Sequence, residues 1–130
     1  MPKRILLVGH CGPDSTYLRM AVKGALGDVA LVSADDNEEL DKALQQTIDL
    51  VLFNRELGYG FAPETGVEMI RVLKKRGLGM NMMLVSNYPE AQAQAQAAGA
   101  IPGFGKREIG APRTAQLLRA AVGEPAKAEK

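Results

Sequence analysis

The stretch DLVLFNREL (49–57) contains four consecutive apolar residues, Leu50 to Phe53, followed directly by the amide Asn54. A short apolar run without alternation is typical of a strand that is buried on both faces of a parallel sheet. Asn54 then stands where that strand ends. The sequence therefore predicts a central buried strand, and it raises the question of why the strand ends in an amide and not in an acid.

Strand and helix patterns alternate along the chain on both sides of this stretch. Strands are predicted at 4–9, 29–33, 49–54, 81–86 and 101–105, and helices at 15–26, 37–46, 65–75, 89–98 and 112–122. Short apolar strands that are separated by helices indicate a parallel sheet covered by helices on both faces. We predict an α/β fold, a doubly wound five-stranded parallel sheet in a flavodoxin-like three-layer sandwich.

Length and composition restrict the classes of protein. A chain of 130 residues suits one domain, predicted over 1–122, and the last residues, 123–130, contain no large apolar side chain and are predicted to be a disordered tail. Sixteen basic and fifteen acidic residues give a net charge of +1 without a basic stripe, so we expect no nucleic-acid ligand. The single cysteine, Cys11, forms no internal disulfide, and no run of the sequence is typical of a signal peptide or a membrane span. We expect a cytoplasmic protein.

Five residues lie at or just after the predicted strand ends. They are Gly9, His10, Asn54, Ser86 and Lys106. In open parallel sheets ligands bind beyond the carboxyl ends of the strands, so these residues form the candidate site.

The chain resembles the receiver domain of the two-component response regulators over about residues 3–122. The resemblance rests on DLVLFN (49–54), Gly66, MMLVSN (82–87) and AAGAIPGFGK (97–106). It implies a receiver-like fold in which an aspartate that accepts a phosphoryl group would fall on Asn54. The pair of acids that helps to hold Mg²⁺ would fall on Gly9 and His10. In the family a serine or threonine ends the fourth strand and a lysine ends the fifth strand. These two positions would be retained here, as Ser86 and Lys106.

Three of these five positions have lost the chemistry of the family. A carboxamide lacks the charge and basicity to attack phosphorus, so Asn54 is a degenerate phosphoacceptor position. Gly9 and His10 are degenerate acid-pair positions that supply no carboxylate to Mg²⁺. The adjacent His10 and Cys11 are too few and too close in sequence for a zinc site. We therefore expect no catalytic residue, no metal, no cofactor and no enzymatic activity.

Two functions remain open. In the first, the chain is a phosphorylation-independent, receiver-like protein-interaction module in signalling, which binds a protein partner or forms a homodimer through the face from the fourth to the fifth helix. In the second, Lys106 is a lone cation among backbone N–H groups, and the strand-end pocket with Ser86 senses a small anion or metabolite. The sequence does not identify the partner.

Three further segments carry local predictions. The loop 55–65 holds Tyr59 and Phe61, which suit either a partner contact or a lid over the pocket. The stretch AQAQAQAA (91–98) favours helix but has no large apolar anchor, so its helix is predicted to pack thinly. Asp14 or Ser15 is the predicted N-cap of the first helix.

Overall fold

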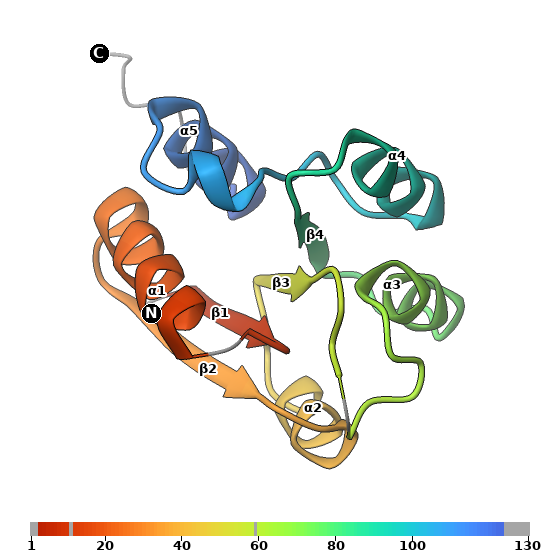
Figure 1. The fold of residues 1–130 in the computed structure, drawn as a ribbon. Coiled ribbons are helices and arrows are strands. Elements are labelled where there is room, and N and C mark those ends of the chain that lie inside the picture. Colours follow the sequence, from red (N-terminus) through yellow and green to blue (C-terminus); the bar gives the residue numbers. More distant parts are fainter. Residues whose placement is uncertain (1–2, 11, 59, 124–130) are drawn as a thin grey trace.

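The computed structural model describes residues 3–10, 12–58 and 60–123, and within them it contains four strands and five α-helices (Figure 1). Predictions that concern Cys11, Tyr59 and 124–130 lie outside the described residues. No helix of the described part is long and apolar enough to cross a membrane. The elements are β1 (Lys3–Val8), α1 (Gly12–Leu26), β2 (Val29–Ala34), α2 (Asn37–Leu44), β3 (Leu50–Asn54), α3 (Gly66–Lys75), β4 (Asn81–Val85), α4 (Pro89–Ala98), a 3₁₀ turn (Lys106–Glu108) and α5 (Pro112–Ala121).

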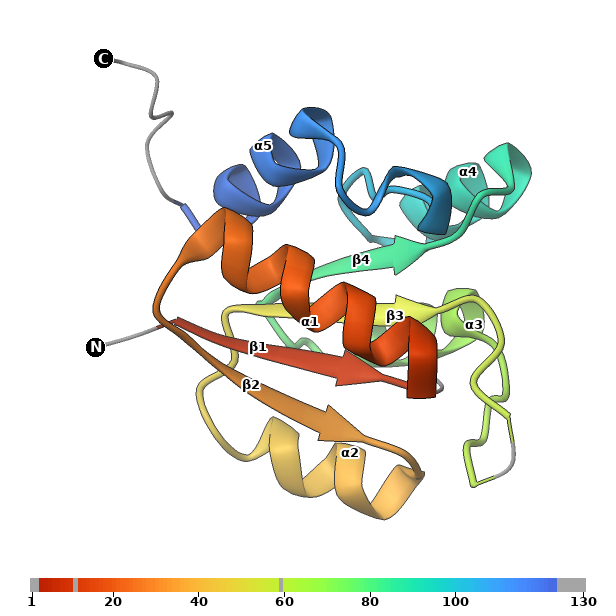
Figure 2. The same ribbon diagram turned by 60° about the vertical axis from the view of Figure 1, so that its left-hand side comes forward.

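The four strands form one parallel sheet in the order β2-β1-β3-β4 (Figure 2). β3, the strand that the apolar run predicts, lies between β1 and β4, and its residues Leu50 to Phe53 are fully buried. The carboxyl ends of β1, β3 and β4 therefore meet at one edge, as the strand-end argument requires.

Helices cover both faces of the sheet. α1 and α5 lie on one face, and α2, α3 and α4 lie on the other (Figure 1). Alternate residues of each strand serve the two layers: Leu50 and Leu52 of β3 pack in the cluster with α1 and α5, whereas Val51 and Phe53 pack in the cluster with α2, α3 and α4. This is the doubly wound three-layer arrangement that the sequence predicts.

The predicted fifth strand is wrong as a regular element. Residues 101–105 run beside β4, but they make only an isolated parallel bridge, between Phe104 and Val85. The Ile101 N–H donates to the Met82 carbonyl at 2.9 Å, and Pro102 comes next, which has no N–H to donate. The sheet therefore has four strands with this segment along its β4 edge.

A glutamine of α4 also occupies this edge. The Gln92 amide donates from Nε2 to the carbonyls of Leu84 at 2.9 Å, Ser86 at 3.1 Å and Phe104 at 3.3 Å. Gln92 thus donates hydrogen bonds to carbonyl groups on both sides of the seam between β4 and residues 101–105. α4 otherwise buries only the small side chains of Ala91, Ala95 and Ala98, in accordance with the predicted thin packing.

The first helix begins earlier than predicted. α1 starts at Gly12, so Asp14 and Ser15 lie in its first turn and are not its N-cap. This correction matters for the site, because it places the Asp14 carboxylate at the edge where the strands end.

The loop 55–65 folds onto the core. The side chain of Phe61 is buried among the residues of the α2 and α3 layer, so Phe61 is neither an exposed partner contact nor a lid. Backbone and side-chain hydrogen bonds between Asn37 at the start of α2 and Gly60 and Ala62 fix the loop. Its position follows from these contacts, which the local sequence does not reveal.

Candidate functional site

The candidate residues meet at the carboxyl edge, but they fall into two groups. Asn54, Ser86 and Lys106 line one cavity of about 300 Å³, together with Arg55, Glu56, Val85, Asn87 and Tyr88. Gly9 contacts Asn54 through its backbone carbonyl and does not line this cavity. His10 lines a different hollow, beside the start of α1.

Asn54 uses its amide as a hydrogen-bond donor. Its Nδ2 donates to the Gly9 carbonyl at 3.2 Å and to the Glu56 carbonyl at 2.9 Å. Both neighbours are acceptors, so the side chain must present N–H groups to them, which an ionised carboxylate cannot do. This is a structural answer to the opening question: the amide ties the end of β3 to the end of β1 and to the following loop.

Gly9 has no room for a side chain. Its backbone φ of +77° lies in the region that L residues rarely adopt, and a Cβ there would lie 2.7 Å from Cδ2 of Leu57. Leu57 is itself buried. The position that would carry an acid in the resembling family is therefore closed by packing.

His10 is held by a backbone bond across the sheet. Its Nε2–H donates to the Leu52 carbonyl at 2.9 Å, which fixes the tautomer. Burial, as the largest cause, lowers the pKa of His10 to about 4, and the positive charge of Lys106 acts in the same direction. The imidazole is therefore uncharged near neutral pH, and its Nε2 is not available to a metal.

Lys106 is paired with an acid. Its Nζ lies 2.7 Å from Oδ2 of Asp14, and both side chains are about one-third exposed, at 36% and 35%. The prediction that Lys106 is a lone cation is wrong, because it took no account of a carboxylate 92 positions away in the sequence. The longer α1 brings that carboxylate to the strand ends.

Ser86 lies at the end of β4 and is buried. Its Oγ accepts a hydrogen bond from the Tyr88 N–H at 3.1 Å, and this bond forms a local turn directly before α4. Its backbone N–H donates to the Phe104 carbonyl at 2.9 Å. The hydroxyl thus has a structural role as well as a place in the cavity wall.

Arg55 is a site residue that the sequence reasoning misses. Its guanidinium carbon lies 4.7 Å from the centre of the Tyr88 ring, and Nη1 lies 3.2 Å from the Glu56 carboxylate. The signal for it was its position directly after Asn54, with an aromatic residue just after the neighbouring strand. Arg55 joins the loops that follow β3 and β4 by a cation–π contact.

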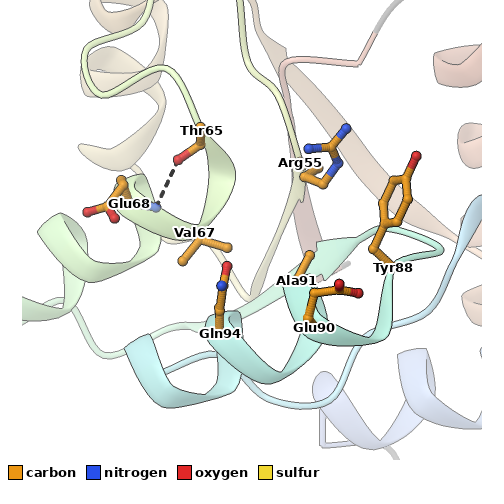
Figure 3. Close-up of a pocket in the computed structure, with 8 residues that line it drawn as sticks. All are labelled: Arg55, Thr65, Val67, Glu68, Tyr88, Glu90, Ala91 and Gln94. Carbon is orange, nitrogen blue, oxygen red and sulfur yellow. Dashed lines mark hydrogen bonds between the residues drawn. The ribbon is translucent and has the colours of Figure 1, made fainter.

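A second groove adjoins this contact, between the starts of α3 and α4. Figure 3 shows Arg55 and Tyr88 on one side of it and Thr65 and Glu68 on the other. The groove has a volume of about 460 Å³, and Val67, Glu90, Ala91 and Gln94 complete its lining. Its lining contains the guanidinium of Arg55 and the carboxylates of Glu68 and Glu90, so the groove favours neither anionic nor cationic ligands.

The Mg²⁺ site that the resemblance implies does not fit these residues. Asn54 presents N–H groups, Gly9 has no side chain, and the Nε2–H of His10 is bonded to a carbonyl. The carboxylates of Asp14 and Glu56 are paired with Lys106 and Arg55, and Asp35 lines the separate hollow beside His10. Mg²⁺ requires several oxygen ligands in octahedral geometry, and the described residues of this edge do not offer such a set.

Comparison with known proteins identifies the fold. No protein-family model and no curated protein sequence matches the chain. Among solved structures, the non-phosphorylated receiver domain of the stress response regulator RcsB from Escherichia coli matches with a TM-score of 0.73 at 10% identity, over 95% of this chain and 96% of that one. A response regulator from Thermotoga maritima matches with a TM-score of 0.71 at 18% identity, over 95% and 100%.

A third structure adds an assembly. The beryllofluoride-activated receiver domain of NtrC4, solved as a dimer, matches with a TM-score of 0.66 at 14% identity, over 92% of this chain and 95% of that one. These identities are low, so the likeness concerns the fold. The chain has the α/β fold of response-regulator receiver domains.

Proposed function

We propose that this chain is a receiver-like protein-interaction module in signalling that works without phosphorylation of its strand-end site and without enzymatic turnover. The observation that carries the proposal is the pair of hydrogen bonds that Asn54 donates to the Gly9 and Glu56 carbonyls. They make the amide a structural link at the position where the resembling family has its phosphoacceptor. An amide in this role is not a nucleophile.

Incubation with acetyl phosphate and Mg²⁺ tests the proposal. The intact mass, measured by mass spectrometry, is expected to stay unchanged. A receiver domain that carries the strand-end aspartate serves as the positive control in the same buffer. A phosphoryl mass on this chain that hydroxylamine removes would show that another carboxylate accepts the group and would refute the proposal.

Association through α4 and α5 is part of the proposal. The NtrC4 receiver domain was solved as a dimer, and in this chain α4 offers the exposed small residues Ala93 and Ala97 with no charged side chain after Glu90. Small uncharged residues permit close approach of a second helix. Sedimentation over a range of concentrations tests whether the chain forms such a homodimer.

The anion or metabolite sensor remains the second candidate, with less support. Its cavity contains Ser86 and Lys106, and Arg55 adds a second cation. The Asp14 carboxylate, however, already pairs with Lys106 at 2.7 Å. An anion would have to compete with this internal partner.

A further inference from the structure

The groove between the starts of α3 and α4 has the dimensions of a small-molecule site. Its volume of about 460 Å³ falls within the range of about 300–1,000 Å³ that is usual for ligand pockets. Its lining comes from the loops after β3 and β4 and from the first turns of α3 and α4. Figure 3 shows Arg55 above the groove in that view and Glu90 below it, on α4. A cation and a carboxylate thus border the same hollow.

The centre of the groove is apolar. Val67 of α3 and Ala91 of α4 are both buried, and Figure 3 shows them between the two helices. The ring of Tyr88, a residue that is 55% exposed, adds an open aromatic surface at the edge of the groove. These surfaces suit a small aliphatic group, because its burial removes apolar surface from water.

The cation of the groove is oriented but keeps free donors. The Arg55 guanidinium carbon lies 4.7 Å from the centre of the Tyr88 ring, and this contact restricts its position. Its ion pair with Glu56, at 3.2 Å, joins side chains that are 42% and 69% exposed, and such exposed pairs contribute little. A guanidinium has five N–H donors in a planar fork, so donors remain for a bidentate bond to a ligand carboxylate.

Glu90 supplies the available carboxylate of the groove. Glu68 also belongs to the lining, but its Oε1 lies 2.5 Å from Nη1 of Arg71, so it already has a cation. None of the ion pairs among the described residues involves Glu90, which is exposed. A carboxylate in the first turn of α4 also interacts favourably with the helix dipole, and this leaves its oxygens accessible to a ligand ammonium.

We propose that this groove binds a free α-amino acid with an aliphatic side chain. The ligand carboxylate bonds to Arg55, its ammonium bonds to Glu90, and its side chain covers Val67 and Ala91. A simple anion would meet the charge of Glu90 and a simple cation that of Arg55, whereas a zwitterion has a partner for each of its charges. The site goes beyond the proposed interaction function and does not depend on it.

A series of ligands with one aliphatic group tests the two charges. L-Leucine carries both charges, isocaproate keeps only the carboxylate, and isoamylamine keeps only the ammonium. Binding to the full chain is measured by NMR titration of the backbone amide shifts. L-Leucine is expected to shift amides of the groove lining with a Kd of about 1 mM or tighter, and to bind at least about tenfold more tightly than either of the other ligands.

Variants assign each charge of the ligand to its partner. Arg55→Gln should lower the affinity for leucine to about that for isoamylamine, and it should not weaken the binding of isoamylamine. Glu90→Gln should lower the affinity for leucine to about that for isocaproate, and it should not weaken the binding of isocaproate. Each loss should be at least about tenfold, equivalent to about 1.4 kcal/mol. Removal of a ligand charge together with its partner then costs no more than removal of either alone.

Two control variants lie outside the groove. Arg113 pairs with an exposed glutamate, as Arg55 does, and Glu38 lies in the first turn of α2, as Glu90 does in that of α4. Arg113→Gln and Glu38→Gln should leave the binding of leucine unchanged. The melting temperature of each variant without ligand separates an effect on the helix from an effect on the site. The ligand series uses the wild-type chain, so it tests the proposal even if a variant unfolds.

Three results would overturn the proposal: no saturable shift with leucine, equal binding of leucine and a ligand with one charge, or variants that weaken all three ligands alike. The acetyl phosphate test has a separate outcome. A chain that stays unphosphorylated but does not bind leucine loses only the amino-acid site. A chain that gains a phosphoryl group but binds leucine as expected loses only the proposed function.

Discussion

The two halves of the strand-end edge are built differently. At the ends of β1 and β3, Gly9, His10 and Asn54 are fixed by backbone carbonyls and by the packing of Leu57. At the end of β4, Ser86 and Lys106 line a cavity of about 300 Å³ that Asn54 borders from the other half, and Lys106 pairs with Asp14 of α1, which is about one-third exposed. The positions that lack the acids of the resembling family lie in the closed half. We infer that changes in the closed half act on the stability of the fold, whereas changes in the open half act on ligands.

The largest effect is expected at Gly9. Gly9→Ala forces a Cβ onto a residue with φ of +77° and to within 2.7 Å of Leu57. Strain in this backbone region and overpacking together should lower the free energy of unfolding by about 3–5 kcal/mol. Urea denaturation followed by circular dichroism measures the loss.

Gly27 provides a matched control for Gly9. It has the same φ of +77°, but a Cβ there meets no atom within 4 Å. Gly27→Ala should therefore show the backbone strain alone, about 1–2 kcal/mol. Equal losses in the two variants would mean that packing against Leu57 does not close the Gly9 position, and the contrast between the two halves would fail there.

The fold could be predicted from the sequence further than the site could. The apolar run of β3 and the alternation of strands and helices report local burial, and they predict the parallel three-layer fold correctly. The fifth strand was overpredicted for two reasons. Pro102 has no backbone N–H to donate, and the Gln92 side chain of α4 occupies carbonyl groups of Leu84 and Phe104. An apolar pattern does not show such competition between a side chain and a strand.

The site depends on contacts between distant residues. The loss of the acids at Asn54 and Gly9 could be read from residue types. The pairing of Lys106 with Asp14 could not, because it depends on where α1 begins and on how the chain folds between positions 14 and 106. The anchoring of Phe61 in the core has the same kind of cause, since its loop is held by Asn37 of another element.

The next largest effect is expected at Asn54. Asn54→Asp removes two donated hydrogen bonds and directs a carboxylate at the carbonyls of Gly9 and Glu56. The loss in unfolding free energy should be about 2–3 kcal/mol at pH 7. The new carboxyl is disfavoured in its charged form when folded, so its pKa is raised, and the loss should shrink as the pH falls below about 5.

Asn81→Asp is a matched control for this change. Asn81 also donates through Nδ2 to a carbonyl, that of Ala121 at 2.7 Å, but it makes a single such bond at an exposed position. Its loss should stay below about 1 kcal/mol. If Asn54→Asp is as stable as the wild type at pH 7, the amide is not the link that we describe.

The Asn54→Asp variant should also remain unphosphorylated by acetyl phosphate, because the ligands for Mg²⁺ are still missing.

Burial of His10 should make the stability of the fold depend on pH. Its pKa is about 4 in the folded chain, mainly because of burial, and about 6.5 when unfolded. The unfolded chain therefore binds the proton first as the pH falls, and stability is lost between about pH 6.5 and pH 4. Between pH 7 and pH 5 the loss should be about 2 kcal/mol.

The assignment to His10 can be checked directly, since the chain contains one histidine. His10→Gln keeps a side-chain N–H for the Leu52 carbonyl but does not titrate, so its unfolding free energy should change much less from pH 7 to pH 5. Urea denaturation at a series of pH values compares the two proteins. A wild-type profile that is flat over this range would show that the imidazole is not held uncharged by burial.

The smallest effect on stability, and the clearest test of the open half, concerns Lys106. Its ion pair with Asp14 is about one-third exposed, so Asp14→Asn should change the free energy of unfolding by less than about 1 kcal/mol. The same change frees the Lys106 ammonium beside the cavity. If the carboxylate occupies the place of an anion, phosphate should raise the melting temperature of Asp14→Asn but not that of the wild type, because a ligand stabilises the state to which it binds. The double variant with Lys106→Ala should lose this rise. A phosphate shift of equal size in the wild type would instead favour the sensor function, since the internal acid would then be no obstacle to an anion.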